Sequence, residues 1–258
     1  MCPYPIIPSS RRLRPTTCQI DLVFYIIQIY INYTIEMYRL KKHITFILGF
    51  IFLSRHMIID TRSSVTNDLA LGFTRLPFNK SYYTNHKPYN LPLDERYSLI
   101  NDVHKLWVFA TDKPFSRGNP THPRSELFIN GYKYSTGVWQ FEAHVFVPHG
   151  TSGVSLMQVF GGNPHATTLM VRVYDGNLYY YRNKVIFRHI YDKWFRLNVI
   201  HDVEGNSVKV YINGVLKFKG HGRGGTKHYF KCGVYAQDQD SFYMESRWKH
   251  IKIYNKSN

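Results

Sequence analysis

The sequence predicts an all-β fold in which two antiparallel sheets pack face to face as a β-sandwich or jelly roll. Short runs of alternating apolar and polar residues succeed one another from residue 68 onward, with turn signals between them. Two of these turns are Asp-Gly and Asn-Gly pairs, the strongest short-range signal of a hairpin. No part of this region has a sustained apolar period of about 3.6 residues, so we expect only a few short helical turns. Two packed sheets follow from so many short strands, and a concave outer face would form a ligand groove.

Individual strands follow from the alternation. In residues 137–148, GVWQFEAHVFVP, apolar side chains occupy every second position. Residues 169–182, LMVRVYDGNLYYYR, turn at Asp175-Gly176, and residues 208–218, VKVYINGVLKF, turn at Asn213-Gly214. Further strand-like runs lie at residues 104–110, 125–130, 154–161, 194–201 and 246–254.

The run KHYFKCGVYAQ, residues 227–237, has two contrasting faces. Its apolar face consists of Phe230, Cys232, Val234 and Ala236. Its other face consists of Lys231, Gly233, Tyr235 and Gln237. Because side chains alternate along a strand, we expect the first set in the core and the second set toward a ligand.

Three other runs place polar side chains on an outward face in the same way. The cations and amides among them suit a carboxylate ligand, because charge-assisted hydrogen bonds are the strong ones. Glu126 would repel such a ligand unless it pairs with Arg124, which their two-residue spacing permits. The candidate ligand-binding residues are Arg124, Glu126, Gln158, Arg172, Lys231, Tyr235 and Gln237.

Composition narrows the function classes. With 258 residues and 44% hydrophobic residues, the chain can bury one sizeable core, and we expect one large domain and a monomer. The net charge of +16 favours an anionic partner. Nucleic acid is not expected, because the sequence has no basic helix, zinc spacing or RNA-binding motif. Cys2, Cys18 and Cys232 have no metal-ligand spacing, so we expect no metal and no cofactor.

The N-terminal part has a targeting pattern. Met37 is followed by basic residues, the apolar run ITFILGFIFL at 44–53 and a polar exit, the order of a secretory signal peptide. The run is too short to span a bilayer, and a buried helix is its alternative interpretation. We expect residues 37–66 to be a signal peptide with a short linker and residues 1–36 to be a gene-model extension, a disordered segment or a second apolar anchor. Residues 67–258 then form the folded domain, with 25 basic and 14 acidic residues.

Three short motifs resemble those of the alginate-lyase family of polysaccharide lyases. YFKCGVYAQ, residues 229–237, is similar to its signature strand, with Cys232 in place of the usual Ala. RSEL at 124–127 resembles the Arg-Ser/Thr-Glu-Leu motif, and MQVF at 157–160 lies where the family carries Gln-Ile/Val-His. The motifs occur in the family's order. The resemblance implies a concanavalin-like jelly roll with a groove on the concave sheet.

Two longer stretches are similar to plant citrate-binding proteins, a branch related to those lyases. They are residues 137–176 and residues 194–218. This resemblance implies a signal peptide, delivery to the cell wall or the vacuole, and binding of citrate or another polycarboxylate.

The resemblance also assigns catalytic roles. A lyase acting on a uronate by β-elimination neutralises the carboxylate, removes the adjacent proton and protonates the leaving oxygen. If the family's roles are carried over to this chain, Arg124 and Gln158 would neutralise the substrate carboxylate. Tyr235 would act as the acid that protonates the leaving oxygen. The histidine position is Phe160, and the second arginine of the first motif is Phe128.

These departures make binding the favoured function. We expect a secretory-pathway protein that binds citrate or an acidic glycan. The cations, amides and phenol of the motifs are present, whereas the histidine that would act as the base is not. The alternative is a polysaccharide lyase in which Tyr235 serves as base and acid, or in which His165 or His228 replaces the missing histidine.

Overall fold

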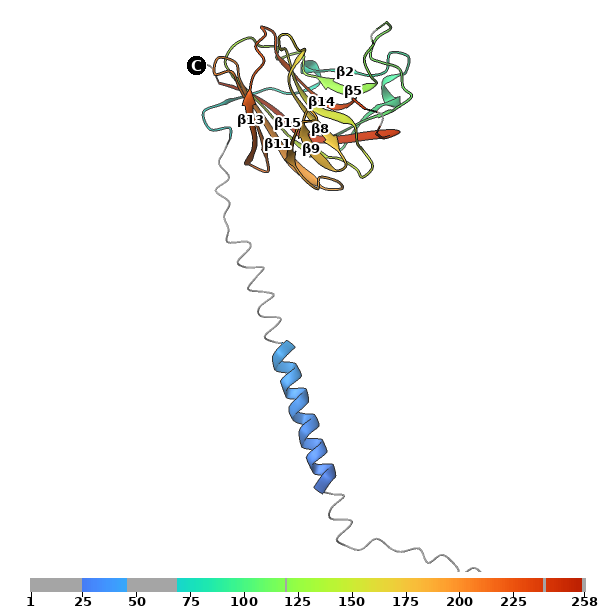
Figure 1. Ribbon diagram of the computed structural model, residues 1–258, viewed down its shortest axis with the longest axis vertical. Coiled ribbons are helices and arrows are strands. Elements are labelled where there is room, and N and C mark those ends of the chain that lie inside the picture. The colour runs from blue at the N-terminus through green and yellow to red at the C-terminus, as the bar shows by residue number, and fades with distance from the viewer. Residues whose placement is uncertain (1–24, 46–68, 119, 239, 257–258) are drawn as a thin grey trace, which may run out of the picture. The chain divides into compact units, whose positions relative to one another are not determined.

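The computed structural model describes residues 25–45, 69–118, 120–238 and 240–256 (Figure 1). The chain divides into two units, residues 1–65 and 66–258, which we describe separately. In the first unit, residues 25–45 are helical with exposed side chains, and this helix crosses the boundary that we placed after residue 36. No helix among the described residues has the length and hydrophobicity needed to cross a membrane. Most of the predicted signal peptide lies outside the described residues, so its processing stays a prediction.

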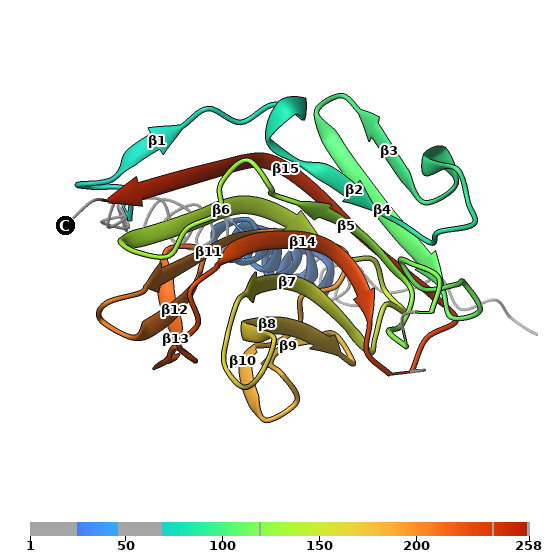
Figure 2. The same cartoon turned by 90° about the horizontal axis from the view of Figure 1, so that it is seen from above.

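The second unit is a sandwich of two antiparallel sheets, as predicted (Figure 2). The larger sheet has the order β13 (Val215–His221), β12 (Ser207–Ile212), β11 (Trp194–Asp202), β6 (Val138–Phe146), β15 (Tyr243–Lys256), β4 (Val103–Phe109) and β3 (Tyr97–Ile100), and β1 (Thr74–Leu76) pairs with β15. The smaller sheet has the order β10 (Lys184–Phe187), β9 (Asn177–Tyr180), β8 (Thr167–Tyr174), β7 (Val154–Phe160), β14 (Tyr229–Ala236), β5 (Arg124–Phe128) and β2 (Thr84–His86).

Each strand-like run of the sequence is a strand of the sandwich. The two predicted hairpins join β8 to β9 and β12 to β13. Asp175 and Gly176 have φ of 47° and 70°, and Asn213 and Gly214 have φ of 51° and 81°. Positive φ at both central residues is the type I′ geometry, whose twist matches that of the flanking strands. The only helical elements among the described residues of this unit are two single turns, η1 (Lys80–Tyr82) and η2 (Leu93–Glu95).

The core lies between the sheets. The alternate residues Phe141, Ala143 and Val145 of β6 are fully buried, and Trp248 of β15 is the largest of the fully buried side chains. On β14, the predicted apolar face, from Phe230 to Ala236, contributes to this core. The opposite face of β14 therefore points away from the larger sheet.

Candidate functional site

The strand register brings the motif residues to one face of the smaller sheet. Tyr235 of β14 lies opposite Arg124 of β5 and Ser155 of β7, and Ser155 lies opposite Arg172 of β8. Neighbouring strands are about 4.8 Å apart, so this row places the Cα atoms of Arg124 and Arg172 about 14 Å from each other. We call the outer face of the smaller sheet the polar face; its central residues are Arg124, Glu126, Ser155, Gln158, Arg172, Lys231 and Tyr235.

A second row crosses the same face. Lys231 of β14 lies opposite Phe128 of β5 and Gln158 of β7, and Gln158 lies opposite Met170 of β8. Four strands thus contribute to the two rows, and Glu126, opposite Gly233, lies between them. Residues distant in the sequence meet here because antiparallel pairing sets β5 and β7 on either side of β14.

Glu126 is the centre of the contacts on the polar face. Its carboxylate accepts a hydrogen bond from Gln158 Nε2. It also lies 3.5 Å from Arg124 Nη1 and 4.0 Å from Lys231 Nζ. Only 1% of Glu126 is exposed. A buried carboxylate requires such partners, because an uncompensated charge in the interior is costly. The pairing of Glu126 with Arg124, one of the two possibilities left open by the sequence, is therefore present.

Gly233 permits this convergence. It lies opposite Glu126, at a bulge where β14 has one more residue than β7 between paired positions. Its φ is 145°, and a Cβ atom built there would lie 2.3 Å from the Ser125 carbonyl oxygen and 2.8 Å from the Glu126 Cα atom. Only glycine fits such a close backbone approach, so β5 can draw near to β14 beside Glu126.

Aromatic rings surround the Lys231 ammonium. Its Nζ atom lies 5.4 Å from the Phe160 ring centroid and 5.8 Å from the ring centroids of both Phe128 and Tyr229. Burial lowers the pKa of Lys231, and the Glu126 carboxylate opposes that shift. The two phenylalanines that replace polar residues of the family motifs therefore both lie against this cation, where cation–π attraction partly offsets its lost hydration.

The Arg124 guanidinium stacks on the phenol ring of Tyr235. The Cζ atom lies 3.7 Å from the ring centroid, and 8% of Arg124 is exposed. Its Nε atom is buried and has no hydrogen-bond partner among the described residues. A buried donor without a partner costs free energy.

Arg172 lies at the other end of the first row. It donates hydrogen bonds to the Tyr174 hydroxyl and Met170 Sδ, both at 3.3 Å, and its guanidinium carbon lies 5.4 Å from the Tyr181 ring centroid. Its Nε atom is likewise buried without a partner in the part of the chain that the structure describes. Aromatic and thioether groups thus hold Arg172 without neutralising its charge.

Gln237 is the one predicted ligand-binding residue that the structure joins neither to these two rows nor to Glu126 between them. Its Nε2 atom donates hydrogen bonds to the carbonyl oxygens of Tyr235 and Ala236, so the side chain folds back on its own strand. It lies just beyond the end of β14, where no neighbouring strand fixes an outward direction.

One histidine on the polar face was missed by sequence reasoning. His86 of β2 lies opposite Glu126, with its ring 4.0 Å from Phe115 and 5.1 Å from Phe128 between centroids. Burial, and then the charges of Lys231 and Arg124, lower its pKa to about 3, so its imidazole is neutral. Its Nδ1 atom has no partner among the described residues. The short run around it, TNH, has no apolar alternation that could have revealed a strand.

The two histidines proposed from the sequence as substitutes lie elsewhere. His165 is exposed in the turn between β7 and β8. His228 is buried against Tyr134 and His201, and its Nδ1 atom lies 3.2 Å from the Phe160 carbonyl oxygen. Within the described ranges, no group of three or more potential ligands could hold a metal ion.

Comparison with known proteins identifies the family. The family profile described as Alginate lyase matches residues 75–255. The chain belongs to the alginate lyase family. Among curated proteins, the citrate-binding protein of Hevea brasiliensis is 47% identical over 214 residues, which are 83% of this chain and 90% of that protein.

Solved structures of alginate lyases have the same fold. An alginate lyase of polysaccharide lyase family 7 superposes with a TM-score of 0.55 at 17% identity, covering 68% of this chain and 95% of that one. The alginate lyase from Corynebacterium sp. superposes with a TM-score of 0.54 at 17% identity, covering 70% and 92%. The family sandwich is thus preserved, and β5, β7 and β14, the strands with the three motif-like runs, are neighbours in the smaller sheet.

Proposed function

We propose that the polar face binds a carboxylate-rich ligand, citrate or an acidic glycan, and that the protein does not catalyse efficient β-elimination. The observation that carries this proposal is the identity of residue 160. Phenylalanine there can neither take nor give a proton, and a general base typically contributes about 10²–10⁴-fold in rate. The binding groups remain. Arg124, Arg172 and Lys231 are three cations, and the Glu126 carboxylate, which lies near Arg124 and Lys231, offsets one of the three charges.

The arrangement of the cations supports an anionic ligand. Arg124 and Arg172 each keep a buried Nε donor without a partner among the described residues. Both guanidinium groups are held against aromatic rings, so little further ordering is needed when a carboxylate binds. The span of about 14 Å between their Cα atoms suits carboxylates on successive sugars, whereas the similarity to a citrate-binding protein favours a small polycarboxylate.

Calorimetric titration with citrate and with short oligouronates tests the binding site. We expect Arg124→Gln and Arg172→Gln each to weaken binding by about 1.5–3 kcal/mol, since each removes a charge-assisted hydrogen bond. Lys227→Gln is the matched control, because Lys227 is exposed and lies just before β14. Unchanged affinity in both arginine variants would place the ligand elsewhere, and the preferred probe identifies the ligand class.

A polysaccharide lyase is the second candidate, and His86 is the observation that favours it. A neutral imidazole with an unpartnered Nδ1 atom could accept a proton, and Tyr235 could then protonate the leaving oxygen. Release of unsaturated uronates that His86→Gln and Tyr235→Phe both abolish would support this function instead.

We also propose that the protein enters the secretory pathway and reaches the cell wall or the vacuole. The support is the succession of basic, apolar and polar segments after Met37. N-terminal sequencing of the native protein should find a start between about residues 54 and 68. A native chain that retains residue 20 would contradict this route.

A further inference from the structure

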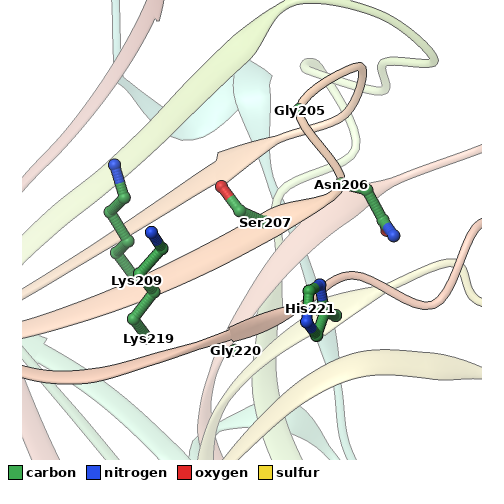
Figure 3. A pocket seen from close by; sticks show the side chains of 7 residues that line it. All are labelled: Gly205, Asn206, Ser207, Lys209, Lys219, Gly220 and His221. Atoms are coloured by element: carbon green, nitrogen blue, oxygen red, sulfur yellow. The ribbon is translucent and has the colours of Figure 1, made fainter.

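A basic pocket lies on the other sheet, away from the polar face. It has a volume of about 430 Å³ and lies at one end of the β12–β13 hairpin (Figure 3). Its position is on the outer side of the larger sheet, because Lys209 alternates with the buried residues Val208 and Val210. We call it the outer pocket; it is lined by Gly205, Asn206, Ser207, Lys209, Lys219, Gly220 and His221.

The outer pocket contains an unfavourable pair of charges. Lys209 and Lys219 are directly opposite each other on β12 and β13, and Figure 3 shows their side chains extending to the same side of the sheet. Like charges in this position destabilise a sheet. No acidic residue lines the pocket, and neither ammonium has an ion-pair partner among the described residues.

Protection of a sheet edge explains only half of this pair. Lysines on an edge strand discourage pairing with other chains, and β13 is the edge of its sheet. Lys209, however, is on β12, which is already paired on both sides by β11 and β13. Edge protection therefore does not explain Lys209.

Further hydrogen-bonding side chains accompany the two lysines. The next register pair on the same face is Ser207 and His221, and Asn206 precedes it in the turn. No Phe, Tyr or Trp ring lines the pocket, so it lacks the stacking surface that a sugar ring commonly uses. Its volume is within the usual range of about 300–1,000 Å³ for small-molecule sites.

We propose that the outer pocket is a second anion site, which takes a small multivalent oxyanion between Lys209 and Lys219. Ser207, Asn206 and His221 add hydrogen bonds to its remaining oxygens. A polycarboxylate and a polyphosphate share this chemistry, and separate titrations with citrate and inorganic pyrophosphate distinguish them. The site is independent of ligand binding on the polar face.

Residue-resolved NMR titration of the folded protein tests the proposal. With either probe, we expect saturable shifts of the amides of Lys209, Lys219 and His221. In Lys209→Gln/Lys219→Gln, the affinity at this site should fall about tenfold or more, while shifts of Gly233 on the polar face stay unchanged. Lys217→Gln is the matched control, because Lys217 is on β13 with Lys219 but its ammonium lies over the Phe187 ring of β10. In this variant, the affinity of the outer pocket for the anion should change less than about twofold.

Thermal unfolding provides an independent readout. Without anions, Lys219→Gln should be at least as stable as the unmodified protein, because it removes a like-charge repulsion. The anion-dependent rise in Tm should be smaller in Lys219→Gln than in Lys217→Gln. Absence of saturable shifts at the outer pocket, or an equal loss of affinity in the Lys217 control, would overturn the proposal.

Discussion

Phe160 and Tyr229 stack, with ring centroids 4.6 Å apart and 11° between their planes. The motif resemblance places Phe160 where the alginate lyase family carries a histidine. The Lys231 ammonium lies 5.4 Å from the same ring. Phe160 therefore contributes to an aromatic surface around a buried cation. Under the proposed function, this position keeps the positive charge of Lys231 on the polar face without adding a proton acceptor beside it.

Placing a histidine at residue 160 should give the protein some β-elimination activity. We expect Phe160→His to release unsaturated uronates above the level of the unmodified protein, because a general base contributes about 10²–10⁴-fold. Loss of the ring stack should cost about 0.5–1.5 kcal/mol of stability. Phe128→His is the control, since it also places an imidazole beside Lys231 but not at the base position. Equal lyase activity in the two variants would show that residue 160 is not the position of the general base.

Neutralising Glu126 should change stability and affinity in opposite directions. Glu126→Gln leaves Arg124 and Lys231 buried without their carboxylate, so unfolding should become easier by about 3 kcal/mol. Citrate should bind more tightly, because a negative charge beside the cations is removed. Chemical denaturation and calorimetry measure the two effects.

Glu95→Gln is the control for Glu126→Gln. The Glu95 carboxylate lies 3.6 Å from Arg96 Nη1 but its side chain is 57% exposed, so its loss should cost less than about 1 kcal/mol. Weaker citrate binding in Glu126→Gln would show that Glu126 positions the cations more than it competes with the ligand.

Gly233 should tolerate no side chain. Gly233→Ala adds a Cβ atom 2.3 Å from a backbone oxygen at a positive φ, and we expect a loss of about 3 kcal/mol together with weakened binding. Gly150→Ala separates the steric clash from the strain of a positive φ. The φ of Gly150 is 87°, but a Cβ atom there meets nothing within 4 Å. It should cost only the left-handed conformation, about 1 kcal/mol. Equal losses in the two variants would exclude the close approach as the cause.

Mild acid should destabilise the domain through buried histidines. Burial lowers the pKa of His104 and of His201 from 6.5 to about 4. The unfolded chain therefore binds more protons between these values, so the free energy of unfolding falls as the pH drops from 6.5 toward 4. Each histidine contributes at most about 3 kcal/mol. Despite burial of the Glu142 carboxyl, hydrogen bonds with Lys252 and Asn198 lower its pKa, so this carboxylate adds stability that is lost as the pH falls below its ordinary pKa.

Denaturation midpoints between pH 7 and pH 4.5 measure this dependence. His201→Gln should flatten it, whereas His165→Gln, at an exposed position, should leave it unchanged. A domain whose stability is constant over this range would contradict the assignment of neutral buried histidines.

The face of β14 was predictable because its side chains alternate. Lys231 and Tyr235 point outward for the same reason that Cys232 and Val234 point inward. The contacts of Glu126 with Gln158 and Lys231 were not predictable, because they depend on the pairing of β5, β14 and β7 and on the bulge at Gly233. His86 was missed because β2 has three residues and no apolar alternation, so only tertiary pairing makes it a strand.

The outer pocket was overlooked for a related reason. Nothing in the sequence pairs Lys209 with Lys219, because their opposition arises from the register of β12 and β13. The bulge between Val210 and Tyr211 shifts that register by one residue. Hairpin turns can be recognised from Asn-Gly, but a bulge within the hairpin has no comparable signal.

The central claim is that the polar face binds carboxylates without cleaving uronate chains. The most direct measurement is the ultraviolet absorbance of unsaturated ends during incubation of the protein with an acidic oligouronate that calorimetry shows to be bound. We predict saturable binding, weakened by Arg124→Gln, with no increase in absorbance above the protein-free control. A steady increase in absorbance with the unmodified protein, abolished by Tyr235→Phe, would contradict the claim and identify an enzyme.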